Sequence, residues 1–416
     1  MNARVAVAFL LTAICAGTAI SAQQVYAPQK PHHTWGDIER GKYLARAGDC
    51  ESCHTALGGK PWAGGRAVPT PFGMVYSMNI TPDKDTGIGA WSSEDFYRAM
   101  HEGIDREGKR LYPAFPYPWY THVPRGDVDA IKAYLDTLKP VRQVDRQPEL
   151  HWPFSMRSML AIWDKLYLHP GQFMPDPKQS AQWNRGAYLV EGPGHCGACH
   201  TDKNFLGAPD RKNPMQGGFA EHVFAPNLGA GERDGLSGWS EKDIAQYLGS
   251  GINAHAIAAG PMAEVVQQST QYLTQDDLQA VAVYLKSLAG PEASQPRMPH
   301  RDTMSEGQAL YVDNCAGCHM DGGEGLANAF PPLRESSAIQ AAEPQLLIAV
   351  ILQGAKSPAT KAKPSGLAMP AFGDKLDDVE VAALTTYIRN EWGNRAATVS
   401  EHDVSKLRGT LASAPQ

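Results

Sequence analysis

Three copies of the pattern Cys-x-x-Cys-His constrain this chain more than any other feature. In each copy, two thiols stand where they can form thioethers with the two vinyl groups of one porphyrin, and the histidine that follows meets the iron from the same face. The chain therefore contains three candidate attachment sites for haem c. The copies are Cys50-Glu-Ser-Cys53-His54, Cys196-Gly-Ala-Cys199-His200 and Cys315-Ala-Gly-Cys318-His319.

A single Cys-x-x-Cys pair is also compatible with a zinc site or a thiol redox pair. Here, however, six of the seven cysteines fall in the three motifs, and histidine follows each pair at once. An odd number of cysteines also disfavours a disulfide framework. We therefore expect three haem c groups at the cysteine pairs, with His54, His200 and His319 as iron ligands.

The surroundings of the three motifs repeat as well. A short helical pattern with a glycine (Gly41, Gly186 or Gly307) precedes each motif. An amphipathic segment follows later, with apolar residues at offsets 0, 3, 6 and 7, which share one helical stripe. The pattern predicts three small helical domains. The segments are Val128, Ile131, Tyr134, Leu135; then Leu278, Val281, Tyr284, Leu285; then Val381, Leu384, Tyr387, Ile388.

The first two repeats share a marked helix start. Ser92 with Asp95, and Ser240 with Asp243, have the spacing of a capping box, in which the serine and the acid each bond the other's backbone. Glycine is expected at the end of both helices because it adopts the left-handed conformation of a helix terminus. These glycines are Gly103 and Gly251.

A haem that only transfers electrons needs a second iron ligand, and methionine sulfur is the ligand that raises the reduction potential. Met262 follows His200 by 62 residues, and Met369 follows His319 by 50. Both are expected in Gly/Pro loops rather than on helical stripes, which disfavours a role as core filler. We expect Met262 and Met369 to ligate the second and third irons.

The first repeat departs from this pattern. Its loop Leu111-Tyr-Pro-Ala-Phe115 aligns with the loop around Met369 and has phenylalanine, which cannot ligate iron, where sulfur is expected. Alignment also places Met78-Asn79 on Pro226-Asn227, a stretch expected to brace the histidine side. The sixth position of the first iron stays open. The other residues weighed for it are Met74, Met78, Met100, His101 and His122.

Residues 1–22 are typical of a cleaved secretory signal peptide. They contain Arg4, an apolar run from Val5 to Cys15, and small residues up to Ala22. The run is shorter than the roughly 20 residues that a bilayer span needs, although a retained anchor is the alternative. The formal net charge of −6 disfavours a nucleic-acid partner. We expect an exported protein that binds no nucleic acid.

The stretch 143–180 is too apolar for a free tether. It is expected to pack across the first two domains, and the alternative is a docking surface. Residues 152–167 are the one candidate for peripheral membrane association, with Leu160 and Trp163 as the side chains to test. The expected division of the chain is a signal peptide at 1–22, domains at 35–142, 181–290 and 301–395, an apolar linker at 143–180 and a polar tail at 396–416.

The chain resembles the tri-haem cytochrome c subunit of membrane-bound bacterial dehydrogenases for alcohol, gluconate, sorbitol, fructose or aldehyde. The resemblance covers nearly all of the chain after the signal. It implies an all-α fold of three tandem class I cytochrome c-like domains. It rests on Gly41-Lys-Tyr-Leu-Ala-Arg-Ala-Gly-Asp-Cys50, Asn79-Ile-Thr-Pro-Asp83, Thr86-Gly-Ile-Gly-Ala-Trp91-Ser, Arg185-Gly-Ala-Tyr-Leu-Val-Glu-Gly, His195-Cys-Gly-Ala-Cys-His200, Gly260-Pro-Met-Ala-Glu-Val-Val266 and Ser365-Gly-Leu-Ala-Met369-Pro.

The resemblance also implies a function. It implies haem at the three motifs, distal sulfur at Met262 and Met369, and docking on a catalytic dehydrogenase subunit of flavin, quinoprotein or molybdenum type. Electrons would pass to ubiquinone or a terminal oxidase at the periplasmic face of the inner membrane. Many family members have methionine in the loop where this chain has Phe115, so the first haem is expected to have a lowered potential or an accessible iron.

Electron transfer is the expected function, with no substrate-oxidising site on this chain. One rival is a peroxidase-like enzyme that uses an open first haem, but the loop around Phe115 offers no evident acid or base to cleave an O–O bond. The other rival is a soluble periplasmic carrier without a fixed partner. The apolar stretch 152–167 disfavours that role, because a diffusing carrier gains little from such a surface.

Overall fold

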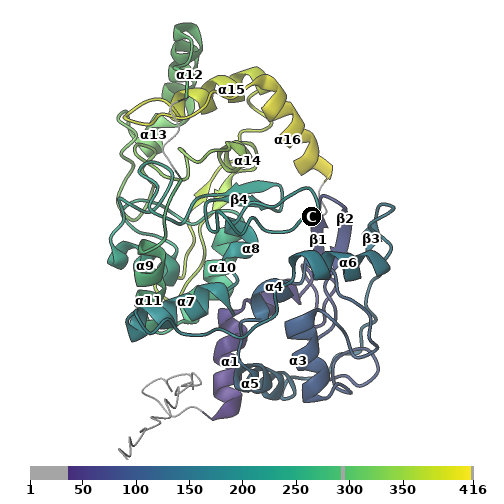
Figure 1. Ribbon diagram of the computed structural model, residues 1–416. Helices are drawn as coiled ribbons and strands as arrows, with labels where there is room; N and C mark the ends of the chain where they lie inside the picture. Colours follow the sequence, from purple (N-terminus) through teal and green to yellow (C-terminus); the bar gives the residue numbers. More distant parts are fainter. Residues whose placement is uncertain (1–35, 292–295, 414–416) are drawn as a thin grey trace, which may run out of the picture.

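The computed structural model describes residues 36–291 and 296–413, and within these ranges the chain is mostly helical (Figure 1). The expected signal peptide at 1–22 lies outside the described residues. Three groups of buried apolar residues form separate cores within 44–135, 187–285 and 311–407. Each core therefore belongs to one of the three sequence repeats.

The first two repeats follow the same order of elements. In both, a long helix and a short motif helix come before a β-hairpin and a capped helix, and a last long helix closes the unit. The first contains α1 (Asp37–Ala47), α2 (Cys50–Cys53), β1 (Ala67–Thr70), β2 (Gly73–Tyr76), α3 (Ser93–Glu102), α4 (Tyr117–Tyr120) and α5 (Arg125–Leu135). The second contains α7 (Ala181–Glu191), α8 (Gly197–His200), β4 (Gly218–Ala220), β5 (Val223–Ala225), α9 (Glu241–Ser250), α10 (Pro261–Gln268), the 3-10 turn η1 (Thr270–Tyr272) and α11 (Gln275–Lys286).

The third repeat is simpler. It lacks the capped helix that follows a tryptophan in the first two repeats, which is α3 in the first and α9 in the second. Its hairpin comes late, directly before the closing helix. It contains α12 (Arg301–Asn314), α13 (Ala316–His319), α14 (Gln345–Gln353), β6 (Ala355–Lys356), β7 (Ala368–Met369) and α15 (Asp378–Ile388), followed by α16 (Glu401–Ser413).

The first and last helices of every repeat cross at a glycine. A Cβ atom at Gly41 would lie 1.8 Å from the carbonyl oxygen of Ala130 on α5, and one at Gly186 would lie 1.9 Å from that of Ala280 on α11. In the third repeat, a Cβ at Gly307 would lie 2.4 Å from the oxygen of Ala383 on α15. Only glycine permits this approach, which explains why a glycine precedes each motif.

The capping boxes predicted from the sequence are confirmed. Ser92 accepts from Asp95 N at the start of α3, Ser240 accepts from Asp243 N at the start of α9, and the acids bond back in both cases. Gly103 and Gly251 end these helices in the left-handed conformation. The apolar stripes at offsets 0, 3, 6 and 7 lie in α5, α11 and α15 and line the three cores.

The description all-α omits seven short strands. β1 and β2 form an antiparallel pair that β3 (Glu149–Leu150) extends, and the other two hairpins pair β4 with β5 and β6 with β7. The sequence analysis did not predict them, because strands of two to four residues are too short to show a period. Among the helices of the described ranges, none has the length and apolar content to span a bilayer.

The segments between and after the repeats both pack on the repeats. In the stretch 143–180, α6 (Ser158–Tyr167) buries Leu160 and Trp163, and Trp163 packs with Tyr117 of the first repeat and Ala208 of the second. The expected packing across the first two domains is thus confirmed for these two side chains, which makes them unsuitable probes of a membrane surface. Residues 396–416 were expected to be a polar tail, but α16 packs on α14 and α15 through buried apolar residues. These residues are Val404 and Leu407, and Val399, just before the helix, joins the same core.

The helix crossing makes a prediction about stability. Gly41→Ala is expected to lower the free energy of unfolding by about 1–3 kcal/mol, since the added methyl group meets backbone rather than a movable side chain. Gly126→Ala on α5, where the new Cβ has nothing within 4 Å, is the control and is expected to be neutral or stabilising by up to about 1 kcal/mol. Urea unfolding followed by circular dichroism checks both. Equal free energies of unfolding in the two variants would contradict the claim that the helix crossing requires glycine at position 41.

Candidate functional site

The first motif places its three chemical groups on one helical turn. Cys50 and Cys53 begin and end α2, so their side chains share a face, and His54 follows directly. His54 Nδ1 lies 2.7 Å from the carbonyl oxygen of Met78. Because a carbonyl only accepts hydrogen bonds, Nδ1 is the protonated nitrogen and donates, which leaves the lone pair of Nε2 free for a metal.

The other two motifs have the same arrangement. His200 Nδ1 donates to the oxygen of Pro226 at 2.7 Å, and His319 Nδ1 donates to that of Pro331 at 3.0 Å. Burial lowers the pKa of all three histidines, which favours the neutral imidazole that metal ligation requires. The predicted match of Met78 to Pro226 is confirmed, since both supply the carbonyl that orients the histidine.

The cysteines are in the state that a thioether requires. All six are free of disulfides. Burial raises the pKa of Cys50, Cys53 and Cys196 to about 12 and that of Cys315 to about 11, whereas a thiol redox pair depends on a lowered pKa. Within residues 36–291 and 296–413, no group of three or more His, Cys, Asp and Glu side chains could hold a metal ion. The raised pKa values thus disfavour a thiol redox pair.

The two predicted distal methionines occupy different elements. Met262 is the second residue of α10 and packs with Tyr247, Ala258 and Val266, so it lies in a helical turn and not in the loop that was expected. Met369 ends β7, paired across the hairpin with Ala355. Both side chains are half-buried. Their ligation of iron stays a prediction.

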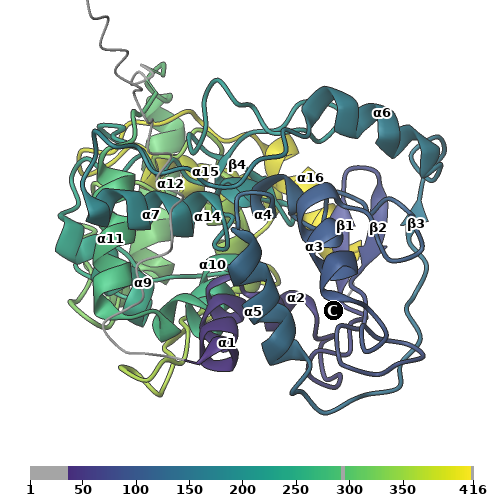
Figure 2. The ribbon, with the colours of Figure 1, turned by 60° about the horizontal axis from the view of Figure 1, so that its bottom comes forward.

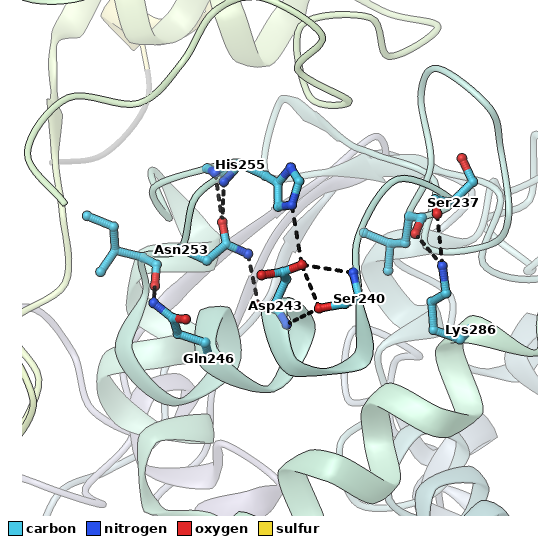
Figure 3. A network of polar contacts seen from close by, with 10 residues as sticks. Ser237, Ser240, Asp243, Gln246, Asn253, His255 and Lys286 are labelled. Carbon is cyan, nitrogen blue, oxygen red and sulfur yellow. Dashed lines mark hydrogen bonds and ion pairs between the residues drawn. The ribbon is translucent and has the colours of Figure 1, made fainter. Parts of the chain in front are cut away.

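A polar network braces the loop that leads to Met262 (Figure 3). Asn253 Nδ2 donates to the backbone oxygen of Asp243 at 2.9 Å, and Asn253 Oδ1 accepts from the backbone nitrogens of His255 and Ala256 at 2.8 Å each. The His255 ring stacks on Trp239 with centroids 5.1 Å apart. The loop between α9 and α10 is thus anchored on the capping box of α9, which fixes where Met262 stands.

Phe115 occupies the position in the first repeat that Met262 occupies in the second. After α3, Leu111 N donates to the oxygen of Gly103 at 2.6 Å, and after α9, Ala258 N donates to that of Gly251 at 2.8 Å. Phe115 comes four residues after the donor Leu111, and Met262 comes four residues after the donor Ala258. The internal alignment that placed phenylalanine in the methionine position is therefore supported by the backbone.

The histidines weighed for the first iron are anchored on the main chain. His101 Nε2 lies 2.7 Å from the oxygen of Val123, and its ring stacks on Tyr97. His122 Nδ1 lies 2.9 Å from the oxygen of Glu191. Met100 is buried in the core of the first repeat. The sixth position of the first iron stays unassigned.

The first two motifs are in direct contact, which the sequence did not indicate. Gly48, two residues before Cys50, accepts at its oxygen from Tyr120 OH, and His195 Nε2 lies 3.2 Å from the same oxygen. Tyr120 and His195 meet edge to face, with centroids 5.3 Å apart. His195 directly precedes Cys196, so the two attachment segments are held at a fixed spacing.

Comparison with known proteins places this geometry in a family. The cytochrome c family model matches residues 38–139 and 304–392, which contain the first and third motifs. The chain is 41% identical over 393 residues to the gluconate 2-dehydrogenase cytochrome c subunit of Pantoea cypripedii, covering 89% of each chain. It is 40% identical to the cytochrome c subunit of the quinone alcohol dehydrogenase of Gluconacetobacter polyoxogenes, covering 96% of this chain and 88% of that one.

The fructose dehydrogenase cytochrome subunit of Gluconobacter japonicus is 36% identical over 436 residues, covering 97% of this chain and 89% of the relative. The chain belongs to the dehydrogenase cytochrome c subunits. The resemblance found in the sequence is confirmed. A cytochrome c holds its haem covalently and transfers electrons, and the free thiols and oriented histidines described above fit that group.

For this cytochrome c subunit, Phe115 gives a spectroscopic prediction. In the reduced protein, carbon monoxide is expected to bind a haem held at the first motif, because Phe115 stands where the second repeat has Met262. Phe115→Met is expected to abolish this binding and to raise the potential of the first haem. Phe205→Met, at a residue 85% exposed in the second repeat, is the control and should bind carbon monoxide as the wild type does. The absence of any carbon monoxide adduct in the wild type would contradict the prediction.

Proposed function

We propose that this chain is an electron-transfer subunit with three covalent haem c groups in three class I cytochrome c-like domains. One observation carries the proposal: each cysteine pair is followed by a histidine whose Nδ1 donates to a carbonyl, so that three Nε2 atoms are prepared for iron. The attachment pairs are Cys50 with Cys53, Cys196 with Cys199 and Cys315 with Cys318, the proximal ligands are His54, His200 and His319, and the distal ligands of the second and third irons are Met262 and Met369.

Bound haem supplies a one-electron iron couple whose potential depends on axial ligands and burial. The residues of the chain orient the imidazoles, exclude water and keep the attachment segments at constant spacing. No organic substrate has to be bound or broken by them. This division of labour is the usual one for a protein that carries a redox cofactor.

Helix α10 connects the three repeats, which supports a continuous electron path. Its Glu264 forms a two-pronged ion pair with Arg66 of the first repeat, and Arg66 Nη1 also donates to the oxygen of Ser52, inside the first motif. Toward the third repeat, Gln267 Oε1 accepts from Ala359 N at 3.2 Å. The helix that carries Met262 thus contacts the first motif and the chain that leads to Met369.

The donor and the acceptor are proposed from the relatives. Two of them are named as subunits of gluconate 2-dehydrogenase and of a quinone alcohol dehydrogenase. We infer a catalytic dehydrogenase partner of flavin, quinoprotein or molybdenum type, and ubiquinone or a terminal oxidase as the acceptor. The proposed location is the periplasmic face of the inner membrane, after export by the signal peptide at 1–22.

Phe115 also bears on the peroxidase alternative, because it puts no sulfur at the position that Met262 occupies in the second repeat. The residues around it argue against catalysis of O–O cleavage. Phe115 packs on Tyr117 and Tyr120, and the nearest carboxylate of this cluster, Asp164, accepts from Tyr117 OH and is paired with Arg110. A carboxylate tied in this way is poorly placed to serve as a general base.

The test is quinone reduction by the membrane-bound complex. Deletion of this chain is expected to abolish substrate-dependent quinone reduction, while the catalytic subunit still reduces a soluble dye. Undiminished quinone reduction after deletion would refute the proposal. Isolation of the wild-type complex should yield the chain together with a larger subunit that contains a second cofactor.

A matched pair of variants tests the role of α10. Arg66→Ala is expected to slow electron transfer between the first two haems several-fold at unchanged haem content, because the first motif loses its bond to Ser52 and its link to Glu264. Arg146→Ala removes a more exposed arginine at the start of the linker 143–180 and is expected to have no effect. Stopped-flow reduction monitored at the haem bands measures both. Equal rates in the two variants would contradict the role of α10.

A further inference from the structure

The segment 151–174 exposes an apolar ridge on the outside of the molecule. We define the ridge as Trp152, Met156, Met159, Ile162 and Leu166, of which Trp152 is 78% exposed, Ile162 61% and Leu166 57%. Figure 2 shows α6 at the edge of the molecule. Isolated exposed apolar residues are common on proteins, but five within fifteen residues form a patch that calls for an occupant.

The ridge is held outward by a firmly packed inner face. Met159, Ile162 and Leu166 stand at offsets 0, 3 and 7 of α6, on one stripe, while Leu160 and Trp163 are buried on the other. Trp163 Nε1 donates to the oxygen of Leu206 at 2.9 Å. The buried face of α6 already makes the contacts with the core. The ridge is therefore a second apolar face of the helix, and it is exposed to solvent.

Within residues 150–175 the exposed charges have one sign. Between Glu149 and Asp176 the only acid is Asp164, which is buried and paired with Arg110. Lys165 is exposed between the ridge residues Ile162 and Leu166. The chain as a whole has a formal net charge of −6, so a stretch without an exposed acid is a local departure. Such a surface complements anionic lipid headgroups.

We propose that the ridge inserts into the surface of a bilayer that contains anionic phospholipid. A tryptophan, long aliphatic and thioether side chains, and a neighbouring lysine on a helix parallel to the surface are the features of an interfacial helix. A protein partner fits less well, because protein interfaces are depleted in lysine and usually offer charges of both signs at the rim.

The position of the ridge links it to the first haem site. The inner face of α6 packs in one cluster with Tyr117 and Phe115, and Phe115 also contacts the core of the first repeat. Insertion of the ridge thus brings the first repeat to the lipid surface. This orientation rests on the proposed electron transfer to a membrane acceptor, whereas lipid binding itself does not.

Vesicle flotation of the haem-loaded protein tests the proposal. Residues 23–416, expressed behind a cleavable export signal, are expected to float with vesicles of phosphatidylcholine and phosphatidylglycerol. The double variant Ile162→Ser, Leu166→Ser should bind at least about tenfold more weakly, because two apolar side chains no longer insert. Lys165→Gln should weaken binding to anionic vesicles about fivefold, the effect of one charge near the surface.

Val312→Ser, Val379→Ser is the matched control, since these valines are 57% and 48% exposed on helices of the third repeat. It should bind vesicles as the wild type does. All variants should keep the wild-type haem spectrum, which shows that they are folded. Undiminished vesicle binding by the ridge variant, or equal binding of the wild type to neutral and anionic vesicles, would overturn the proposal. So would a ridge variant that binds vesicles normally but no longer co-purifies with the catalytic subunit.

The assay involves no electron transfer, so it can fail or succeed independently of the proposed function. A protein that floats with vesicles but does not support quinone reduction would refute the proposed function alone. A protein that supports quinone reduction but does not float with vesicles would refute only the proposal that the ridge inserts into a bilayer.

Discussion

A hydrogen bond from histidine Nδ1 to a backbone carbonyl is the interaction on which the whole account depends. It recurs at His54, His200 and His319, and it determines which nitrogen remains available for iron. The carbonyl belongs to Met78 in the first repeat and to prolines in the other two, so the main chain and not a particular side chain supplies the acceptor. Metal-ligating histidines are generally oriented by such a partner, which also raises their basicity as ligands.

The bond requires that the motif and the carbonyl segment be held in register, and the helix crossings do this. The glycine in the first helix of each repeat allows it to approach the last helix to within backbone contact. Helix α10 then connects the repeats, through Glu264 to Arg66 and through Gln267 to Ala359. Fixed spacing between attachment segments is what the proposed electron transfer needs, because the protein's part is to position the redox cofactor.

Local signals in the sequence were sufficient for the motifs, the closing helices and the capping boxes, since each depends on residues within one or two turns. The Phe115 position was also predictable, and the shared backbone bond of Leu111 and Ala258 supports it. Contacts between distant residues were not predictable. Arg66 and Glu264 are 198 residues apart, and no local pattern in the sequence pairs them.

Amphipathic character could not be resolved where both faces of a helix are apolar. In α6, the sequence offers two stripes, and only the packing shows that Leu160 and Trp163 are inside while Ile162 and Leu166 are outside. In 396–416, a few apolar residues among many polar ones gave too weak a period to predict α16, whose buried side depends on the presence of α14 and α15. The short strands were missed for the same reason, because their pairing is tertiary.

Intact mass spectrometry after denaturation and thiol alkylation measures directly how many haems the chain holds covalently. The account predicts the mass of the polypeptide after signal removal plus three haems, with no alkylated cysteine. A smaller number of haems, or an alkylated Cys50, Cys53, Cys196, Cys199, Cys315 or Cys318, would contradict it.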